Sequence, residues 1–551
     1  MAKPLASATI AAPGFLGLNT QESSIQLSSG FALTAQNCVI DRYGRVGSRR
    51  GWDNVNTWAE NPEDEATALA ASDLGENNIE FLFEMADPTD GNKLISGGNN
   101  KLFVGTTTLT TKTVRNADNS GDATYTISGN DWQAASLPYG DGAAAVPHAY
   151  LVQSGHPALV YHELPVSGGG GHDHDSGSYG FQRLGDVGSL PPGYSTADFQ
   201  PNTVLAAYGR IWMADIIGDR QTIYFSQLLN GSEFNGGDSG SLSLNAVFPN
   251  TDQIIGIAAH NGFLIIFGRN NIAIYSSPID VTQLTLADFI PNVGCVARDS
   301  IVNTGTDIIF LSDSGVRSLQ RVIQEKSLPM RDISKNVRDE LVANVASETT
   351  TKIRAVYYDR DAFYLLALPA TRYVYCFDLR GALQDGSARV TIWDNIEPHA
   401  FTTTIAKELL IGKAGYIGKY YGHTDNGSSY RMRYFTNYFD FEQPTTIKVL
   451  KKAAFVVIGG SEQAVAVKYG FEYTDNYRSI TKILDSATVY EYGVGEYNIA
   501  EYSGGIVLDR FTANLGGSGV VMQIGLESDI EGNPLSIQKI DIGVKAGKTL
   551  L

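Results

Sequence analysis

The feature that most constrains this chain is a degenerate repeat in its middle part. Each unit consists of a short apolar strand, a turn centred on Gly or Asn, a second apolar strand and often a third that ends in Ser or Asp. The units recur at roughly forty to fifty-five residues, which is the scale of a propeller blade. Clear copies occupy residues 203–226, 254–276, 299–319, 354–378 and 406–417, and weaker ones can be read at 79–104 and 148–164.

A short unit of this kind cannot cover its own hydrophobic face, so the units must stack around an axis or on one another. We therefore predict an all-β chain in which residues 52–425 form a degenerate β-propeller of about five to seven blades. The alternative is an irregular stack of β-sheets. The 58 glycines, set among many Val, Ile, Thr, Tyr and Phe residues, are typical of short strands joined by tight turns.

The pattern of apolar and polar residues changes after residue 425. Several longer segments alternate apolar and polar residues, and Gly-Gly pairs such as 459–460 and 516–517 separate them. This pattern predicts a β-sandwich-like module over residues 426–551 that completes or decorates the propeller. Residues 1–51 are set apart as an N-terminal arm and hairpin.

One amphipathic helix is predicted over residues 332–345. Its apolar residues recur four apart in a single stripe, formed by Ile333, Val337, Leu341 and Val345. Asp332 or Ser334 is placed to cap the N-terminus of this helix. We expect the stripe to pack against a blade rather than to receive a partner.

Charge is distributed unevenly along the chain. Residues 1–51 carry a net charge of +3, residues 52–425 carry −19, and residues 426–551 carry −2. A body this acidic disfavours tight nucleic-acid binding. The positive N-terminal segment can pair with acidic surface, but exposed pairs contribute only about 0–1 kcal/mol each. We therefore expect its apolar side chains to anchor it, and replacement of Arg49 and Arg50 to matter less than its deletion.

Sequence motifs of the common catalytic classes are absent. The chain has no HExxH, GxSxG or Walker A motif, and no GxGxxG after a predicted strand. Cys38, Cys295 and Cys376 are far apart and form no CxxC pair, so neither a zinc site nor a disulfide framework is predicted. The apolar stretch 5–12 is too short and interrupted for a signal peptide, and no stretch is long enough for a membrane-spanning helix.

Two polar clusters could be taken for metal sites. His172, Asp173, His174 and Asp175 follow four glycines and offer imidazole and carboxylate groups to a divalent cation, but the glycine lead-in provides no preorganisation. We predict a surface loop there. The segment 118–122 resembles the start of a calcium loop but lacks the terminal Glu, and it is interpreted as a turn. We expect no metal and no cofactor.

Propellers can carry glycosidase sites, which require paired carboxylates. The candidates at strand ends are Asp215, Asp313, Asp359, Asp361 and Asp378. Asp is common in turns because it bonds to local backbone amides, so these positions are also expected without catalysis. The segment 310–316 loosely matches a sialidase Asp-box, but Leu311 occupies the Ser/Thr position and no aromatic residue closes the motif. No catalytic residue is predicted.

The most specific sequence feature is the N-terminal segment. It follows the order Gly-Leu-Asn, Gly, Asn, Asp-x-x-Gly-x-Val, Arg-x-Gly, carried by residues 17–21, 27–30, 35–37, 39–41, 44–46 and 49–51. We expect an extended arm, a turn at Gly30 and a hairpin with its tip at residues 42–44, where Gly44 needs a positive φ. This order resembles the start of the tail nozzle (hub) proteins of short-tailed bacteriophages, a family that includes packaged-DNA stabilisation and tail tubular B-type proteins. Beyond residue 51 the resemblance rests on the order of elements.

The resemblance implies a structural virion protein rather than an enzyme. The family forms a ring, typically a hexamer, beneath the tail adaptor ring and next to tail fibres or tail needle and tip proteins. Such a ring retains packaged genomic DNA and conducts it during ejection without sequence-specific binding, in a virion tail assembled in the bacterial host cytoplasm. An acidic lining would let DNA slide, although the charge could equally serve solubility alone. The alternative is a β-propeller that binds or cleaves carbohydrate.

Overall fold

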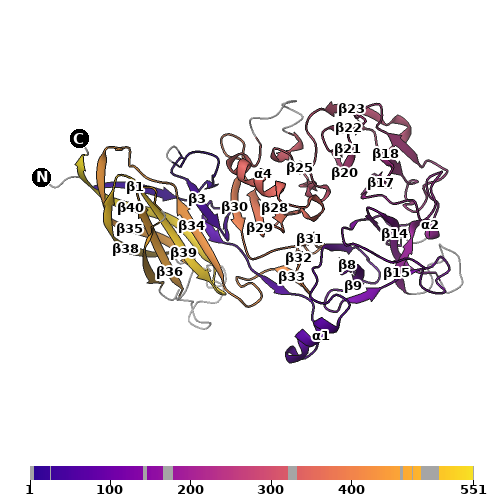
Figure 1. The fold of residues 1–551 in the computed structure, drawn as a ribbon, viewed down its shortest axis with the longest axis horizontal. Helices are drawn as coiled ribbons and strands as arrows, with labels where there is room; N and C mark the ends of the chain where they lie inside the picture. The colour runs from indigo at the N-terminus through magenta and orange to yellow at the C-terminus, as the bar shows by residue number, and fades with distance from the viewer. Residues whose placement is uncertain are drawn as a thin grey trace, which may run out of the picture.

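The computed structural model describes residues 5–24, 27–139, 146–165, 178–320, 332–459, 463–474, 476–484 and 508–549. Short antiparallel sheets surround an axis at one end of the elongated body, and longer strands form a second lobe at the other end (Figure 1). The Gly- and Asn-centred turns of the repeat join the strands within each sheet, often through residues of positive φ such as Asn261 and Gly262.

Seven sheets form the blades of a propeller. Blade 1 has β7 (Phe81–Met85), β8 (Lys93–Gly98), β9 (Lys101–Val104) and β10 (Thr110–Lys112); blade 2 has β12 (Gln133–Ser136), β13 (Ala149–Gln153), β14 (His156–Glu163) and β15 (Tyr179–Arg183), with β11 (Val114–Arg115) at its edge. Blade 3 has β16 (Thr203–Ala207), β17 (Arg210–Ile216), β18 (Asp219–Phe225) and β19 (Gly240–Ser243); blade 4 has β20 (Ile254–His260), β21 (Phe263–Gly268), β22 (Ile272–Ser276) and β23 (Thr285–Ile290).

The remaining blades follow in chain order. Blade 5 has β24 (Val302–Asn303), β25 (Ile308–Ser312) and β26 (Gly315–Ser318); blade 6 has β27 (Arg354–Tyr358), β28 (Phe363–Leu368), β29 (Tyr373–Asp378) and β30 (Arg389–Trp393); blade 7 has β31 (Ala400–Thr403), β32 (Leu409–Gly412), β33 (Ile417–Tyr420) and β6 (Trp52–Asn54). The first strands of the blades contact one another in a closed ring, from β7 through β12, β16, β20, β24, β27 and β31 back to β7. The predicted propeller is confirmed, with seven blades.

The second lobe is a β-sandwich. One sheet contains β38 (Leu508–Gly519), β35 (Thr446–Gly459), β40 (Leu535–Thr549), β5 (Val46–Ser48), β4 (Cys38–Ile40) and β1 (Leu5–Ala11). The facing strands are β3 (Phe31–Gln36), β34 (Tyr430–Thr436), β39 (Met522–Ile530), β36 (Ala464–Phe471) and β37 (Arg478–Ile483), with β2 (Gly17–Leu18) beside β3. The segment set apart as an N-terminal arm thus contributes five strands to the C-terminal sandwich, where β1 pairs along β40.

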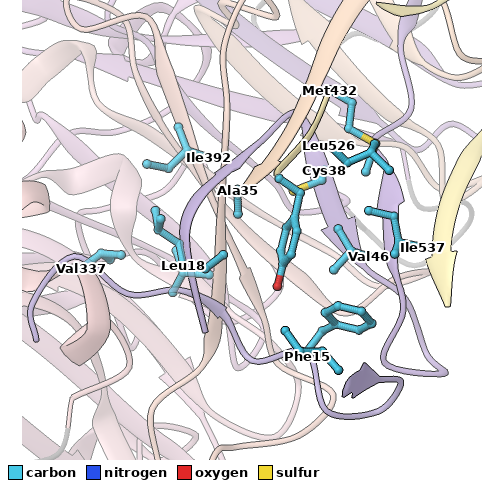
Figure 2. Packing of buried hydrophobic residues seen from close by; sticks show 14 of the residues in the cluster. Phe15, Leu18, Ala35, Cys38, Val46, Val337, Ile392, Met432, Leu526 and Ile537 are labelled. Carbon is cyan, nitrogen blue, oxygen red and sulfur yellow. The ribbon is translucent and has the colours of Figure 1, made fainter. Parts of the chain in front are cut away.

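The first 54 residues of the chain join the two lobes in two ways. Strand β3 lies between β30 of blade 6 and β34 of the sandwich, so blade 6 and one sandwich sheet form a single ten-stranded sheet. Strand β6 then supplies the outer strand of blade 7 and closes the propeller. The largest core cluster is continuous across this joint: Phe15, Leu18, Val46, Ile392 and Leu526 all belong to it (Figure 2).

The amphipathic helix is present, but it begins later than predicted. It consists of a 3₁₀ turn, η4 (Lys335–Val337), followed by α4 (Arg338–Ala346). Ile333, Val337 and Leu341 are buried in the core, which confirms that the stripe packs internally. The capping prediction is wrong, because the Ser334 Oγ accepts the backbone N–H of Val316 and Asp332 pairs with Arg338.

Candidate functional site

Four charged side chains meet across the propeller axis. Arg298 and Asp299 lie in η3 (Arg298–Ser300), which leads into blade 5; Arg354 opens β27 of blade 6, and Asp131 precedes β12 of blade 2. Arg298 Nη2 lies 3.0 Å from Asp131 Oδ1 and 2.9 Å from Asp299 Oδ2. Arg354 lies 3.0 Å and 3.1 Å from the same two oxygens. Because blade 2 is not adjacent to blades 5 and 6, these pairs span the axis.

The four groups, here called the axial network, are largely removed from solvent. The side chains of Arg298 and Arg354 are each 7% exposed, and those of Asp131 and Asp299 are 20% and 18% exposed. Burial raises the pKa of Asp131, with repulsion from Asp299 adding to it and the two Arg residues opposing it. Burial also acts to raise the pKa of Asp299, but attraction by Arg298 and Arg354 outweighs it and lowers that pKa. The network is neutral overall, which offsets the cost of burying its charges.

Two cavities meet at the axial network. One, of about 240 Å³, is lined by Asp131, Arg298, Asp215 and Arg220. The other, of about 190 Å³, is lined by Arg354 and by residues of the inner strands of blades 1, 2, 6 and 7. Asp299 borders both cavities. Paired charges therefore lie between the two cavities along the axis of the propeller.

Sequence reasoning did not single out the axial network. A signal was present, since two of the clear repeat copies begin at Asp299 and Arg354. The first strand of each unit is the innermost one, so a charge at its start lies near the axis. Recognising this signal requires that the units be known to form a closed ring.

The five carboxylates considered for glycoside chemistry are distributed over blades 3, 5 and 6. Four of them have a cationic partner: Asp215 pairs with Arg220, Asp313 with Arg269, Asp359 with Lys407, and Asp378 with Arg380. Asp361 borders a separate cavity described below. The Asp-box-like segment 310–316 is the ordinary hairpin between β25 and β26.

Of the two polar clusters considered as metal sites, the structure describes only one. His172, Asp173, His174 and Asp175 lie outside the described residues. The segment 118–122 is a turn, in which Asp118 accepts the Ser120 N–H and Asp122 pairs with Arg115. Within the described ranges, no three His, Cys, Asp or Glu side chains are grouped so that they could hold a metal ion.

The three cysteines are free and buried. Burial raises the pKa of the Cys295 thiol to about 11, so this thiol stays protonated near neutral pH. Among the helices in the described part of the chain, none has both the length and the apolar character needed to span a membrane.

A second polar centre lies at the joint between the propeller and the sandwich. Arg49 is fully buried, and its guanidinium donates hydrogen bonds to Asp425 (2.8 and 2.6 Å), to the Asn37 Oδ1 (2.9 Å) and to the Asp394 carbonyl (3.2 Å). The guanidinium also lies over the ring of Tyr430, 4.0 Å from its centroid. These contacts connect β5 to blades 6 and 7 and to β34.

The residues of the N-terminal pattern occupy positions in this joint that suit their types. Asn37 has a φ of 51° and donates from its Nδ2 to Asp394 and to the Arg431 carbonyl. The predicted hairpin is confirmed, since β4 pairs with β5 and Gly44 has a φ of 72°. A Cβ on Gly51 would lie 1.7 Å from the Thr424 carbonyl oxygen, so only glycine fits there.

The fold and these sites define a seven-bladed β-propeller fused to a β-sandwich by its own N-terminal segment. Neither a protein-family model nor a curated protein matches the chain. Among solved structures it is similar to the Neurospora crassa Pan2 WD40 domain, at 11% identity over 68% of this chain and 96% of that one, with a TM-score of 0.35. It is also similar to the WD40 β-propeller domain of Doa1, at 8% identity over 52% and 94%, with a TM-score of 0.24. At these identities the likeness concerns the fold alone.

Proposed function

We propose that this chain is a structural subunit of the tail nozzle, or hub, of a short-tailed bacteriophage. Copies form a ring, typically a hexamer, that retains packaged DNA and conducts it during ejection. In this proposal the chain performs no catalysis and resides in the virion tail. Its partners are the adaptor ring, tail fibres or tip proteins, and DNA that passes without sequence-specific contacts.

The observation that carries the proposal is the role of the N-terminal pattern. Residues 17–51 hold the resemblance to the nozzle family, and the same residues build the joint between the two lobes. Asn37, Arg49 and Gly51 have types that the geometry of this joint requires. The pattern therefore fits a propeller whose N-terminal residues close its ring and join it to a sandwich. A generic strand would not need these residue types.

The axial network adds a constraint to the proposal. Arg298, Arg354, Asp131 and Asp299 are paired across the axis of each propeller. DNA would then pass through the central space of the ring, between copies, and not along the axis of a single propeller. The net charge of −18 suits such a passage, because carboxylates outnumber the Lys and Arg side chains that would hold the phosphates.

The carbohydrate-active alternative is less well supported. A glycosidase needs two carboxyl groups that face one bond, about 5–10 Å apart. The carboxylates at the mouth of the propeller, Asp131 and Asp215, are each paired with arginine.

The test is to locate the chain in particles. Mass spectrometry and cryo-electron microscopy of purified virions should find it as a ring at the tail. Particles assembled without it should lose packaged DNA. Its absence from virions, or its presence there as an isolated monomer, would contradict the proposal.

A further inference from the structure

A large basic cavity lies between the sandwich and the propeller of this acidic chain. Its volume is about 570 Å³, and it is bordered by the β4–β5 hairpin of the sandwich, by turns of blade 6 and by the end of β33 in blade 7. The charged side chains that line it are five arginines and two aspartates: Arg42, Arg45, Arg50, Arg360, Arg380, Asp41 and Asp361. The cavity thus carries a formal excess of three positive charges in a protein of net charge −18.

Three of these cations are not neutralised by the fold. Arg45 pairs with Asp41 at 2.6 Å, and Arg380 pairs with Asp378 at 2.8 Å. Arg42, Arg50 and Arg360 have no carboxylate within ion-pair distance among the described residues, and Arg42 and Arg360 are exposed at the rim. Tyr43, 49% exposed, lies beside them beneath the guanidinium groups of Arg42 and Arg45. Arginine and tyrosine, together with tryptophan, are enriched at the centres of protein interfaces.

His423 also lines the cavity and is affected by the positive charges of neighbouring arginines. Burial lowers its pKa, and the charges of Arg50 and Arg49 lower it further, whereas a hydrogen bond with the Arg49 carbonyl acts in the opposite direction. The imidazole therefore stays neutral near pH 7 and does not add to the charge of the cavity. The anion-binding capacity depends on the arginines.

The same chain has an acidic protrusion whose charge is opposite to that of the cavity. Between Arg50 and Lys93 the sequence contains no lysine or arginine. Within this stretch η1 (Pro62–Asp64) and α1 (Glu65–Ala71) project from the body (Figure 1). Glu60, Glu63 and Asp64 are exposed there and have no cationic partner among the described residues. We call residues 60–71 the acidic knob.

The cavity and the acidic knob lie at opposite ends of blade 7. Tyr420, at the end of β33, lines the cavity and pairs with Trp52 at the start of β6. β6 runs from there towards the other end of the blade, where the Trp58 Nε1 donates to the Gly415 carbonyl at 2.9 Å just before the knob. The knob therefore cannot enter the cavity of its own chain.

We propose that the basic cavity binds the acidic knob of a second copy of this chain. The contact is heterologous, because each copy offers a knob and a cavity at different places, and such contacts generate rings or open filaments. The carboxylates of Glu60, Glu63 and Asp64 meet the guanidinium groups of Arg42, Arg50 and Arg360. This inference rests on the proposed function, for which it supplies the contact that joins neighbouring subunits.

The experiment reverses charge on each side and then combines the two variants. Sedimentation velocity over a concentration series at low ionic strength measures self-association of the full chain. Arg42→Glu/Arg360→Glu and Glu63→Lys/Asp64→Lys should each weaken the association constant at least tenfold, and salt should weaken the wild type. An equimolar mixture should regain association, because the reversed cavity fits the reversed knob and the two unchanged surfaces still fit each other. Lys451→Glu/Lys452→Glu, on an exposed face of the sandwich, is the matched control and should associate like the wild type.

Each remaining outcome contradicts the inference. A wild-type chain that stays monomeric at all concentrations, or a mixture that fails to regain association although both variants melt like the wild type, would overturn it. Binding of inorganic phosphate or of a DNA duplex that depends on Arg42 and Arg360, without self-association, would assign the cavity to phosphate instead. None of these results would displace the proposed function, since a ring found in virions could be joined by another surface.

Discussion

The guanidinium of Arg49 holds the carboxylate of Asp425 through two hydrogen bonds of 2.8 and 2.6 Å, although 376 residues separate them. Arg49 directly follows the sandwich strand β5, and Asp425 lies just beyond the last strand of the propeller. The pair is buried, with side-chain exposures of 0% and 10%. It therefore fixes the sandwich to the propeller at the point where the chain closes its ring.

Replacing Arg49 by alanine should destabilise the protein strongly. Breaking a buried ion pair by removing one partner costs about 3–5 kcal/mol, because the other charge stays buried without compensation. Chemical denaturation should show this loss for Arg49→Ala, and at most about 0.5 kcal/mol for the neighbouring Arg50→Ala. Equal effects of the two changes would contradict the assigned role. The sequence analysis weighed the charges of this segment as exposed pairs, whereas the Arg49 side chain is buried; the expectation that replacing both arginines matters less than deleting the segment stays a prediction.

Deletion of residues 1–40 should abolish cooperative folding. The deletion removes β1 from β40 and β3 from between β30 and β34, and it empties the core position of Phe15. Thermal circular dichroism should show no native transition. The milder Phe15→Ala should lower the free energy of unfolding by about 3–5 kcal/mol. Ile217→Ala, at a side chain 59% exposed, should change it little. A deletion variant that melts at the wild-type temperature would mean that the segment is dispensable.

Gly51→Ala should destabilise the closure of blade 7. The added Cβ would lie 1.7 Å from the Thr424 carbonyl oxygen, so the backbone must shift and β6 must move relative to β33. Overpacking of this kind costs about 1–3 kcal/mol or more. Gly381→Ala is the control, because its Cβ would meet nothing within 4 Å. If denaturation midpoints of both variants equal that of the wild type, the closure does not depend on this close approach.

Arg298→Met should destabilise the propeller by about 3–5 kcal/mol, because Asp131 and Asp299 lose a shared cation in a buried network. Arg269→Met removes a more exposed partner of Asp313 and should cost only about 0–1 kcal/mol. Urea denaturation of both variants provides the comparison. Similar small losses would mean that the axial network is not a structural support.

Asp385 should make the stability of the helical region depend on pH. Its burial acts to raise the pKa, but hydrogen bonds from Lys335 and Ser387 lower it from 3.8 to about 2. A lowered folded-state pKa contributes stability that is complete above the unfolded value of 3.8 and is lost as the pH falls through about 2. Asp385→Asn should therefore be less stable than the wild type at pH 6, and the difference should shrink as the pH falls and disappear below about pH 2. A difference that does not change with pH would exclude this linkage.

The sequence alone determined the features that depend on a few neighbouring residues. The alternation of apolar strands with Gly and Asn turns specified blade-like units, and the hairpin at Gly44 and the buried stripe of Ile333, Val337 and Leu341 followed from local spacing. These features are set by backbone sterics and by the burial of one face, both of which operate over short stretches of chain.

Only the tertiary structure decided which distant residues meet. Closure into seven blades brings Arg298 to Asp131 and Arg49 to Asp425, and it places strands from residues 5–48 in a sandwich with strands from the C-terminus. It also leaves some arginines buried and paired and others, such as Arg42 and Arg360, exposed around a cavity. Residue type and spacing do not indicate which arginines are paired and which are exposed. The partner of a charge is fixed by the closure of the whole ring and not by its neighbours in the chain.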